Sequence, residues 1–482
     1  MPSWISLRRH FNLKLFIYII CLCLPVILSP LATSSQKEAR CSYVILLVAT
    51  YWLLEPVPIS ATALLPVVLF PILDVVGSAD ICLNYLKESF MMFIGGLLMA
   101  ISVEECRLHE RISLKILMFM GSDIKWLMLG FMMTTAFLSM WISNTATTAM
   151  MIPIVEAVHK KISIPISNDI ALEENTEAYV SEVSTENKEV ENASNEEIPN
   201  NENLQQRNSS IKTVLLLCVC YSANIGGTGS LTGTGTNLVI KVLVDDLYPE
   251  SDEITFGSWI VYSLPGVIIC VSIGWFYLWL IYFKCSKSYH RIASKQTIQD
   301  VISKKYKELG SIRFHEAEVI VLFLLLVLLW VFRDPKFVSG WQNLISFDKK
   351  IGDSVPAIAI AFLLFFLPSD IRNLDSPRIL DWRRAQSKLP WGVIILCGGG
   401  FALADAAQRS GLSKLVSTQL SPLQVLPPIA IVTVVCLMST MLTEILMNTT
   451  TATILMPVFN QMALSIRVNP LLIMLPMTFA CS

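Results

Sequence analysis

Long apolar runs limit the possible folds of this 482-residue chain more than any other feature of its sequence. A helix needs about 20 mostly apolar residues to cross a bilayer. With 54% hydrophobic residues and a mean hydropathy of +0.59, the chain is more apolar than soluble domains usually are. A membrane β-barrel would show alternating polarity rather than solid runs. We therefore expect an all-α polytopic membrane protein with spans in residues 13–31, 42–54 continuing through 58–74, 89–103, 126–142, 212–225, 258–283, 316–332, 355–368, 389–404, 427–442 and 470–482.

Charge and cysteine content exclude several other classes of protein. The net charge of −2 gives no basis for binding nucleic acid, and none is expected as a partner. The twelve cysteines are scattered, mostly in apolar runs, without the spacing of a zinc site or a disulfide framework. They are expected to be small apolar core residues.

The N-terminal segment, residues 1–39, is expected to hold the first membrane helix. Arg8, Arg9 and Lys14 precede its apolar run, so the positive-inside rule predicts a cytoplasmic N-terminus. A cleaved signal peptide is the alternative. A retained helix is favoured because no clear small-x-small cleavage site follows the apolar run.

Two polar stretches interrupt the membrane segments. Residues 159–210 are predicted to be a disordered loop, because 171–210 alone holds ten Glu, one Lys and one Arg. The sequons at Asn192 and Asn208 are patterns that such Asn- and Ser-rich loops often contain by chance. Residues 285–314 are of mixed charge and are predicted to form a helix at the membrane surface.

A polar motif occurs twice at membrane depth. Residues 143–148 read Ser-Asn-Thr-Ala-Thr-Thr, and 447–451 read Met-Asn-Thr-Thr-Thr, 304 positions later. The same offset places Gly95-Gly96 on Gly399-Gly400 and Pro153 on Pro457. We interpret this as an internal repeat. The first copy covers 40–158 and 211–284, and the second covers 315–482.

The residues of the repeated motif weaken a helix. Ser, Asn and Thr side chains compete for backbone hydrogen bonds, and Pro153 favours a re-entrant hairpin around 143–157 over a continuous span. A helix broken here presents N–H groups that attract an anion and carbonyl groups that suit a cation such as Na⁺. A continuous helix with Ser and Thr bonded to their own turns is the alternative for one copy. Two copies in register favour the broken helix.

Residues 226–237 form the second candidate binding segment. These twelve residues contain five Gly and four Thr, so a stable helix is not expected. Irregular backbone at membrane depth persists only where it is buried or lines a cavity. A phosphate-binding loop is the rival interpretation, but no Gly-Lys-Ser/Thr follows.

The membrane segments lack the side chains of several other mechanisms. No chain of Asp, Glu and His residues appears at membrane depth, which favours Na⁺ over H⁺ as the coupling ion. No nucleophile and base occur together there, so an enzyme is not expected. A channel would use a similar polar lining, although the paired broken helices favour alternating access.

These motifs resemble those of the divalent anion:sodium symporter family, in the animal branch of sodium-coupled dicarboxylate, citrate and sulfate cotransporters (the solute carrier 13 group). The resemblance runs from about residue 13 to the last residue. Its motifs follow the family's order and lie in residues 40–71, 138–157, 221–237, 332–341, 390–404 and 469–476.

The resemblance implies a homodimeric, inverted-repeat elevator-type transporter of the plasma membrane, with two re-entrant hairpins and several Na⁺ ions entering with one di- or tricarboxylate. It implies no organic cofactor and no metal other than Na⁺. By position, the implied sodium ligands are Ser139, Ser143, Asn144, Gly227, Thr443 and Asn448. The implied substrate contacts are Asn144, Thr145, Thr228, Asn448 and Thr449. Succinate- or citrate-like substrates are favoured over sulfate.

Two departures from the family pattern affect the second repeat. Met447 stands where the family has Ser, and a thioether is a poor ligand for Na⁺. Residues 479–482 reach the place that 221–222 occupy in the first repeat, so we expect a C-terminally truncated second repeat without a supporting segment beside Asn448. On that basis we expect weak or absent coupled transport, with a non-transporting subunit that pairs with full-length protein as the alternative.

Overall fold

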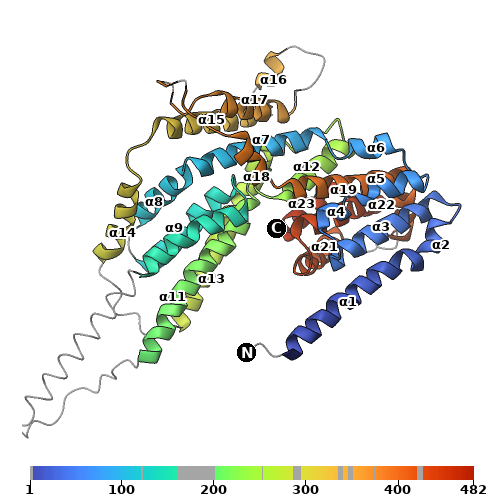
Figure 1. Cartoon of the computed structure of the whole chain (residues 1–482), viewed down its shortest axis with the longest axis horizontal. Helices are drawn as coiled ribbons and strands as arrows, with labels where there is room; N and C mark the ends of the chain where they lie inside the picture. Colours follow the sequence, from blue (N-terminus) through green and yellow to red (C-terminus); the bar gives the residue numbers. More distant parts are fainter. Residues whose placement is uncertain are drawn as a thin grey trace, which may run out of the picture.

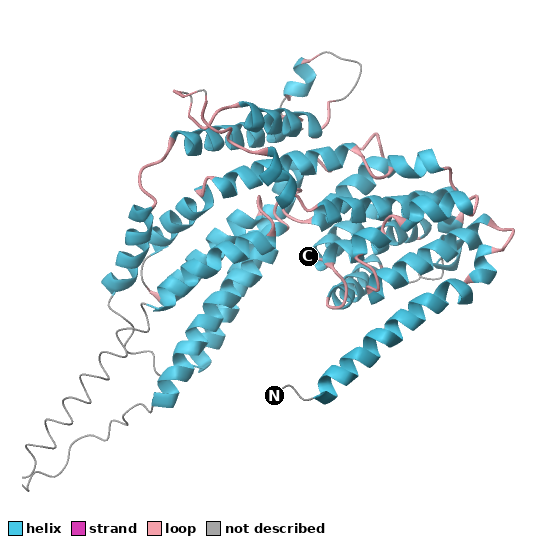
Figure 2. Ribbon diagram, viewed as in Figure 1, coloured by secondary structure: helices cyan, strands magenta, loops and turns pink. Residues whose placement is uncertain are grey.

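The computed structural model describes residues 4–120, 123–160, 201–251, 253–285, 295–334, 340–345, 351–370, 372–373, 375–420 and 427–482. Within these ranges the chain forms helices joined by short turns (Figure 2), and the single β feature is an isolated bridge between Pro368 and Arg378. The expectation of an all-α protein is therefore confirmed for the part of the chain that the structure describes.

The described helices of the first half differ widely in length. They are α1 (Trp4–Ile27), α2 (Ser29–Ala32), α3 (Lys37–Leu54), α4 (Ile59–Thr62), α5 (Leu65–Ile72), α6 (Ser78–Leu83), α7 (Glu88–Glu105), α8 (Leu108–Met120), α9 (Ile124–Ser139), the helical residues 144–160, α11 (Asn201–Gly227), α12 (Gly235–Leu247) and α13 (Phe256–Cys285).

The second half has a similar make-up. Its helices are α14 (Lys295–Glu308), α15 (Phe314–Val331), α16 (Trp341–Leu344), α17 (Ser354–Phe366), α18 (Trp382–Lys388), α19 (Trp391–Arg409), α20 (Leu412–Leu420), α21 (Pro428–Thr443), α22 (Asn448–Ser465) and α23 (Pro470–Ala480).

The predicted apolar runs coincide with these helices. Within the part of the chain that the structure describes, five helical stretches are long and apolar enough to cross a membrane, at Leu15–Ala32, Ser78–Glu105, Phe256–Tyr282, Phe314–Val331 and Trp391–Arg409. Shorter apolar helices cover Ile59–Ile72, Ile124–Ser139, Ile211–Gly227, Ser354–Phe366, Pro428–Thr443 and Pro470–Ala480. The chain is a polytopic helical membrane protein, and many of its apolar helices end before a full bilayer width.

Proline and left-handed residues set several of these ends. Helix α3 stops where Glu55 adopts a left-handed conformation (φ 46°), just before Pro56 and Pro58. Helix α23 begins with Pro470, and the side chain of Asn469 caps it by accepting the backbone N–H of Leu471 at 3.0 Å.

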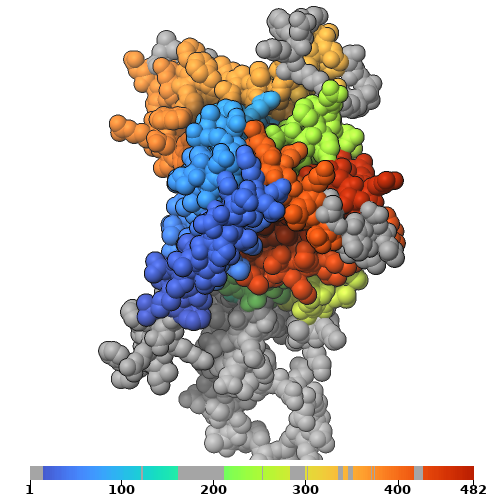
Figure 3. All heavy atoms as spheres, turned by 90° about the vertical axis from the view of Figure 1, so that its right-hand side faces the viewer, coloured from blue at the N-terminus to red at the C-terminus, as the bar shows by residue number. Residues whose placement is uncertain are grey.

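Among the described residues, three apolar clusters hold together the helices that Figure 1 draws. One joins α8, α9, α11 and α13, and a second joins α3, α5 and α6 to α19. The largest lies between them and contains residues of α7, α12, α15, α17, α19, α22 and α23. In Figure 3 the N-terminal helices (blue) lie beside helices of the second half (orange to red), so the two repeats pack against each other.

The helix bounds follow the sequence repeat. Helices α8 and α20 begin 304 residues apart, at Leu108 and Leu412. Helices α9 and α21 both begin and end at that offset, and the helices after each break start at Asn144 and Asn448. The offset of 304 therefore relates the observed helix bounds from α8 to α22.

One backbone detail supports the same correspondence. Arg107, between α7 and α8, has a φ of 55°, and Gly411, between α19 and α20, has a φ of 85°. The two positions are 304 residues apart. A left-handed backbone costs a residue with a Cβ about 1–2 kcal/mol but costs Gly little. The two corresponding turns share this conformation although one of them has Arg and the other Gly.

The structure describes only part of each of the two predicted polar stretches. In the acidic stretch 159–210, residues 161–200 lie outside the described residues, while 201–210 begin α11. In the stretch 285–314, residues 286–294 lie outside them, and α14 occupies Lys295–Glu308.

Gly95 makes the close packing of α7 on α17 testable. A Cβ on Gly95 would lie 2.7 Å from the backbone carbon of Ala357, so Gly95→Ala should destabilise the protein by about 1–3 kcal/mol through overpacking. Gly266→Ala on α13 is the control, because no atom lies within 4 Å of the added Cβ. Equilibrium unfolding in detergent should show a loss for Gly95→Ala alone; equal effects would contradict this account of the packing.

Candidate functional site

The first helix break brings three polar groups together. Helix α9 ends at Ser139, and the chain turns through 140–143 before helix resumes at Asn144. The buried Ser139 Oγ lies 2.8 Å from Asn144 Oδ1 and 2.7 Å from the carbonyl oxygen of Ala223 on α11. Its single hydroxyl proton serves one of these acceptors at a time. The break is thus anchored to α11.

Asn144 lies directly against the end of α11. Its Nδ2 donates to Asn224 Oδ1 at 3.1 Å. A Cβ on Gly227 would collide with Asn144 Oδ1, so only a glycine permits this approach. Ser139, Asn144 and Gly227, three of the sodium ligands implied by the resemblance, therefore form one contact group.

Residues 228–234 separate α11 from α12. They are fewer than the Gly/Thr-rich stretch 226–237, because Gly226 and Gly227 still belong to α11 and Gly235 begins α12. Thr228 is buried, and its hydroxyl donates to the Ile225 carbonyl at 2.7 Å. The segment is packed inside the protein, as irregular backbone at membrane depth must be.

The second helix break has the same local form. Helix α21 ends at Thr443, the chain turns through 444–447, and α22 begins at Asn448. Asn448 Nδ2 donates to the Ser482 carbonyl at 3.4 Å. Met447 is 51% exposed, and its side chain contributes no oxygen.

The start of α12 joins the two breaks. A Cβ on Gly235 would meet the side chain of Thr449, and Thr236 Oγ1 lies 2.5 Å from Ser482 Oγ. The unwound segment, residues 228–234, directly follows Gly227 of α11, and Gly227 touches Asn144. One short stretch of chain therefore contacts both copies of the Asn motif.

The remaining predicted site residues make contacts within their own turn or helix. Ser143 and Thr145 are exposed, with their hydroxyl oxygens 3.5 Å apart, and Ser143 Oγ accepts the Ala146 N–H at 3.4 Å. Thr443 Oγ1 donates to the Thr440 carbonyl of its own helix at 2.8 Å. The structure brings Ser139, Asn144 and Gly227 together and Thr449 beside Gly235, while Ser143, Thr145 and Thr443 make local contacts.

Each break places opposite partial charges near one point. Helices α9 and α21 end in carbonyl groups, whereas the helices starting at Asn144 and Asn448 present free N–H groups. Carbonyl and amide oxygens suit a hard monovalent cation, and the N–H ends suit a carboxylate. Among the described residues, no three His, Cys, Asp or Glu side chains converge as they would for a transition metal.

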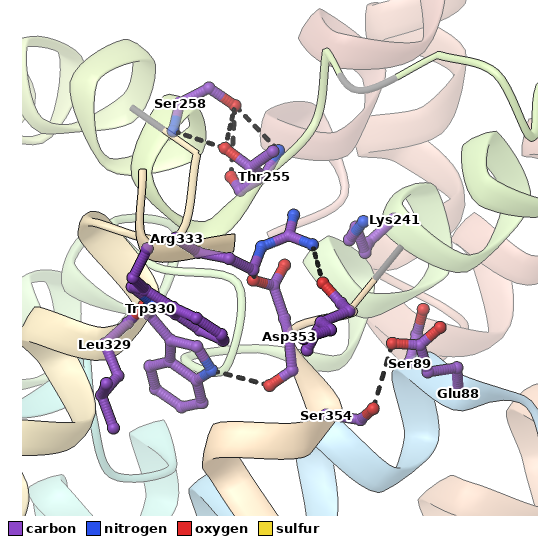
Figure 4. Close-up of polar contacts among 12 residues, drawn as sticks. Glu88, Ser89, Lys241, Thr255, Ser258, Leu329, Trp330, Arg333, Asp353 and Ser354 are labelled. Carbon is purple, nitrogen blue, oxygen red and sulfur yellow. Dashed lines mark hydrogen bonds and ion pairs between the residues drawn. The ribbon is translucent and has the colours of Figure 1, made fainter. Parts of the chain in front are cut away.

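A charged cluster elsewhere was missed by sequence reasoning (Figure 4). The buried Arg333 pairs with Asp353 at 2.7 Å, and Trp330 Nε1 donates to the Asp353 carbonyl at 2.9 Å. Nearby, Lys241 pairs with Asp245 at 2.7 Å, and Asp245 accepts the Ser89 hydroxyl at 2.9 Å. A cavity of about 420 Å³ opens among these side chains.

The cluster had no local sequence signal. Its partners come from the ends of α7, α12, α15 and α17, which are far apart in the chain. Each base of the cluster pairs with a carboxylate: Arg333 with Asp353, Lys241 with Asp245, and Lys87 with Asp246 at 2.9 Å. Glu88 lines the same cavity as a fourth carboxylate beside the three bases and accepts the Ser354 hydroxyl at 3.0 Å, so the cluster ties helix ends together.

An all-helical membrane chain with repeated helix breaks around an unwound segment is a secondary transporter in architecture. Comparison with known proteins agrees: the model of the family described as "Sodium:sulfate symporter transmembrane region" matches residues 10–482. The chain belongs to this family.

Curated relatives cover most of the chain. The Na(+)/citrate cotransporter of Mus musculus is 37% identical, over 96% of this chain and 86% of its own length. The Na(+)/dicarboxylate cotransporter 3 of Mus musculus is 36% identical, over 96% and 83%. Solute carrier family 13 member 1 of Homo sapiens is 36% identical, over 100% and 87%. The family predicted from the motifs is thereby confirmed, and the chain is an integral membrane transporter.

The buried pair of Arg333 and Asp353 provides a stability test. Arg333→Met leaves an uncompensated buried carboxylate and should cost about 3–5 kcal/mol in the free energy of unfolding. Adding Asp353→Leu should recover most of that loss. The control is Arg384→Met, whose partner Glu105 lies in an exposed pair worth about 0–1 kcal/mol. Unfolding in detergent measures all three; a double variant no more stable than Arg333→Met would contradict the pairing.

Proposed function

We propose that this protein carries a di- or tricarboxylate anion across a membrane together with Na⁺. One observation supports this most directly: the two breaks at Asn144 and Asn448, one per repeat, meet the two ends of a single unwound segment. Such a meeting of broken helices suits a site for an anion and its coupling ions. The names of two of the relatives specify sodium-coupled citrate and dicarboxylate transport.

The proposed sodium ligands are the oxygen-bearing groups at the helix ends. At the first break they are Ser139, Ser143, Asn144 and Gly227, of which Ser139 Oγ and Asn144 Oδ1 already lie 2.8 Å apart. At the second break they are Thr443 and Asn448. Na⁺ is thus the co-transported ion, held by neutral oxygens and not by carboxylates.

The proposed substrate contacts lie at the N–H ends of the helices after each break. They are Asn144, Thr145, Thr228, Asn448 and Thr449. Amide and hydroxyl donors there, together with free backbone N–H groups, would bind carboxylates at both ends of a small dianion. Such binding requires no arginine beside either motif.

Sulfate is the second candidate substrate, since the matching family model is described as a sodium:sulfate symporter. The Ser-Asn-Thr-Ala-Thr-Thr sequence at 143–148 and the Gly-Gly-Thr sequence at 226–228 resemble the carboxylate members. A carboxylate is therefore the preferred proposal.

We further propose that the protein is a homodimer in the plasma membrane that works by an elevator motion, with its hairpins re-entrant. The N-terminus is assigned to the cytoplasm, because Arg8, Arg9 and Lys14 precede the apolar stretch Leu15–Ala32. Accessibility of an N-terminal epitope in intact and permeabilised cells tests this orientation; labelling of intact cells would reverse it.

Uptake by cells expressing the full chain tests the transport proposal. We expect labelled succinate or citrate to enter in Na⁺ but not in K⁺ medium, with little competition from sulfate and at a low rate, because Met447 stands where the family has Ser. Asn144→Ala or Asn448→Ala should reduce this uptake to background, because each removes an amide from the meeting point of the repeats. Asn343→Ala on α16, an exposed position, is the matched control. Uptake that ignores Na⁺, or competition by sulfate alone, would contradict the proposal.

Met447→Ser tests the sodium assignment at the second break. It replaces a thioether by the hydroxyl that the first repeat has at Ser143. One added oxygen contact worth about 1 kcal/mol should lower the Na⁺ concentration for half-maximal uptake about fivefold. Met441→Ser, at an exposed position on α21, is the control. An unchanged Na⁺ dependence in Met447→Ser would argue against a sodium site at this break.

A further inference from the structure

We infer that Asn237 is a positioning residue that holds the unwound segment in the shape required for Na⁺ binding. Asn237 is the third residue of α12 and none of its surface is exposed. The inference rests on the proposed transport function, and it adds a residue that is itself neither a sodium ligand nor a substrate contact.

The unwound segment creates a hydrogen-bonding problem that Asn237 solves. Outside a helix, the carbonyl groups at the end of α11 lose their usual partners, and at membrane depth no bulk water replaces them. Asn237 Nδ2 lies 3.1 Å from the carbonyl oxygen of Gly227, 3.4 Å from that of Thr228 and 2.7 Å from that of Ser230. One side chain therefore faces three carbonyl groups of the turn.

Two residues of α13 complete the arrangement. Trp259 Nε1 donates to the Thr228 carbonyl at 3.0 Å, and Ser263 Oγ donates to the Gly229 carbonyl at 2.9 Å. In addition, the Ser230 hydroxyl donates to the Met140 carbonyl in the first break. Of these side chains, Asn237 contacts the largest number of carbonyl groups and reaches the Gly227 carbonyl.

The position of Asn237 connects it to the candidate site. Gly227, whose carbonyl it holds, lies against Asn144. Its neighbours in the chain, Gly235 and Thr236, contact Thr449 and Ser482 of the second repeat. A shift of Asn237 would therefore move Gly227 relative to Asn144, whose side-chain oxygen is a proposed partner of Na⁺.

The chemistry of the contact separates a positioning role from a ligand role. Three acceptors face the Asn237 amide, so its NH₂ group must point toward them. The Oδ1 atom is buried and has no hydrogen-bond partner among the described residues. Aspartate has the same shape but no donor, and its charge would repel the three carbonyl groups. If Asn237 instead bound Na⁺ through Oδ1, aspartate would preserve or strengthen that binding.

The test measures how Na⁺, in place of K⁺, stabilises the purified full chain against heat. Asn237→Ala should raise the Na⁺ concentration for half-maximal stabilisation by about tenfold or more, as changes behind metal ligands commonly do. Asn237→Asp should raise it at least as much. Asn460→Ala is the matched control: Asn460 is equally buried, accepts the Tyr248 hydroxyl at 3.0 Å, and contacts none of the segment's carbonyl groups. It should leave the Na⁺ requirement unchanged.

Three results would overturn the inference. Wild-type Na⁺ affinity in Asn237→Asp would make Asn237 a ligand, and wild-type affinity in Asn237→Ala would leave it without a role. Equal shifts in Asn237→Ala and Asn460→Ala would reduce it to a general contribution to stability. If Asn237→Ala does not fold, Asn237→Ser retains one donor and should still raise the Na⁺ requirement; an unchanged requirement would overturn the inference.

Measurements on the wild-type protein distinguish this inference from the proposed transport function on which it rests. Na⁺-dependent stabilisation and carboxylate uptake by the unaltered chain test the proposed transport, whereas the difference between Asn237 variants and wild type tests the positioning role. A normal wild type with a normal Asn237→Asp variant would leave transport standing and remove only the role of Asn237. A wild type that ignores Na⁺ would overturn both.

Discussion

The need to satisfy backbone hydrogen bonds inside a membrane is the constraint on which this structure depends. A protein that stops a helix at membrane depth must find new partners for the exposed N–H and carbonyl groups. Here the break at 228–234 supplies a partner to the break at 140–143, because the Ser230 hydroxyl donates to the Met140 carbonyl, and Ser139 at the end of α9 reaches the Ala223 carbonyl of α11. The same polar groups make the region suited to ions, so stability and binding have a common origin.

Much of this architecture could be read from the sequence, because apolar runs and helix-breaking residues are local signals. The offset of 304 seen in the Asn motif and the Gly pair also relates the bounds of α9 and α21. Other features depend on contacts that no local pattern records. The sequence did not indicate that Gly226 and Gly227 remain in α11, since close contact with Ala136 and Asn144 decides their conformation.

Non-local electrostatics escaped sequence reasoning for the same reason. Arg333 and Asp353 lie outside the apolar helices α15 and α17, where charged residues look like ordinary membrane-surface groups. Folding buries both and places them beside Lys241 and Asp245 of α12. The far end of α12 is thus fixed by ion pairs, while its near end begins at the unwound segment. The residues expected to bind Na⁺ could be named from motifs, but the supporting role of Asn237 became visible only from distances.

The double attachment of α12 has a thermodynamic consequence. Its first residues touch Thr449 and Ser482, and two residues later Asn237 holds the carbonyl of Gly227. An ion or substrate bound at either break would restrict the same short piece of backbone. The conformational entropy lost on ordering that backbone would then be lost once, by the first ligand, and not again by the second. Cooperativity between the sites would then arise without a large rearrangement, and it would be reciprocal, each occupant raising the affinity for the other by the same factor.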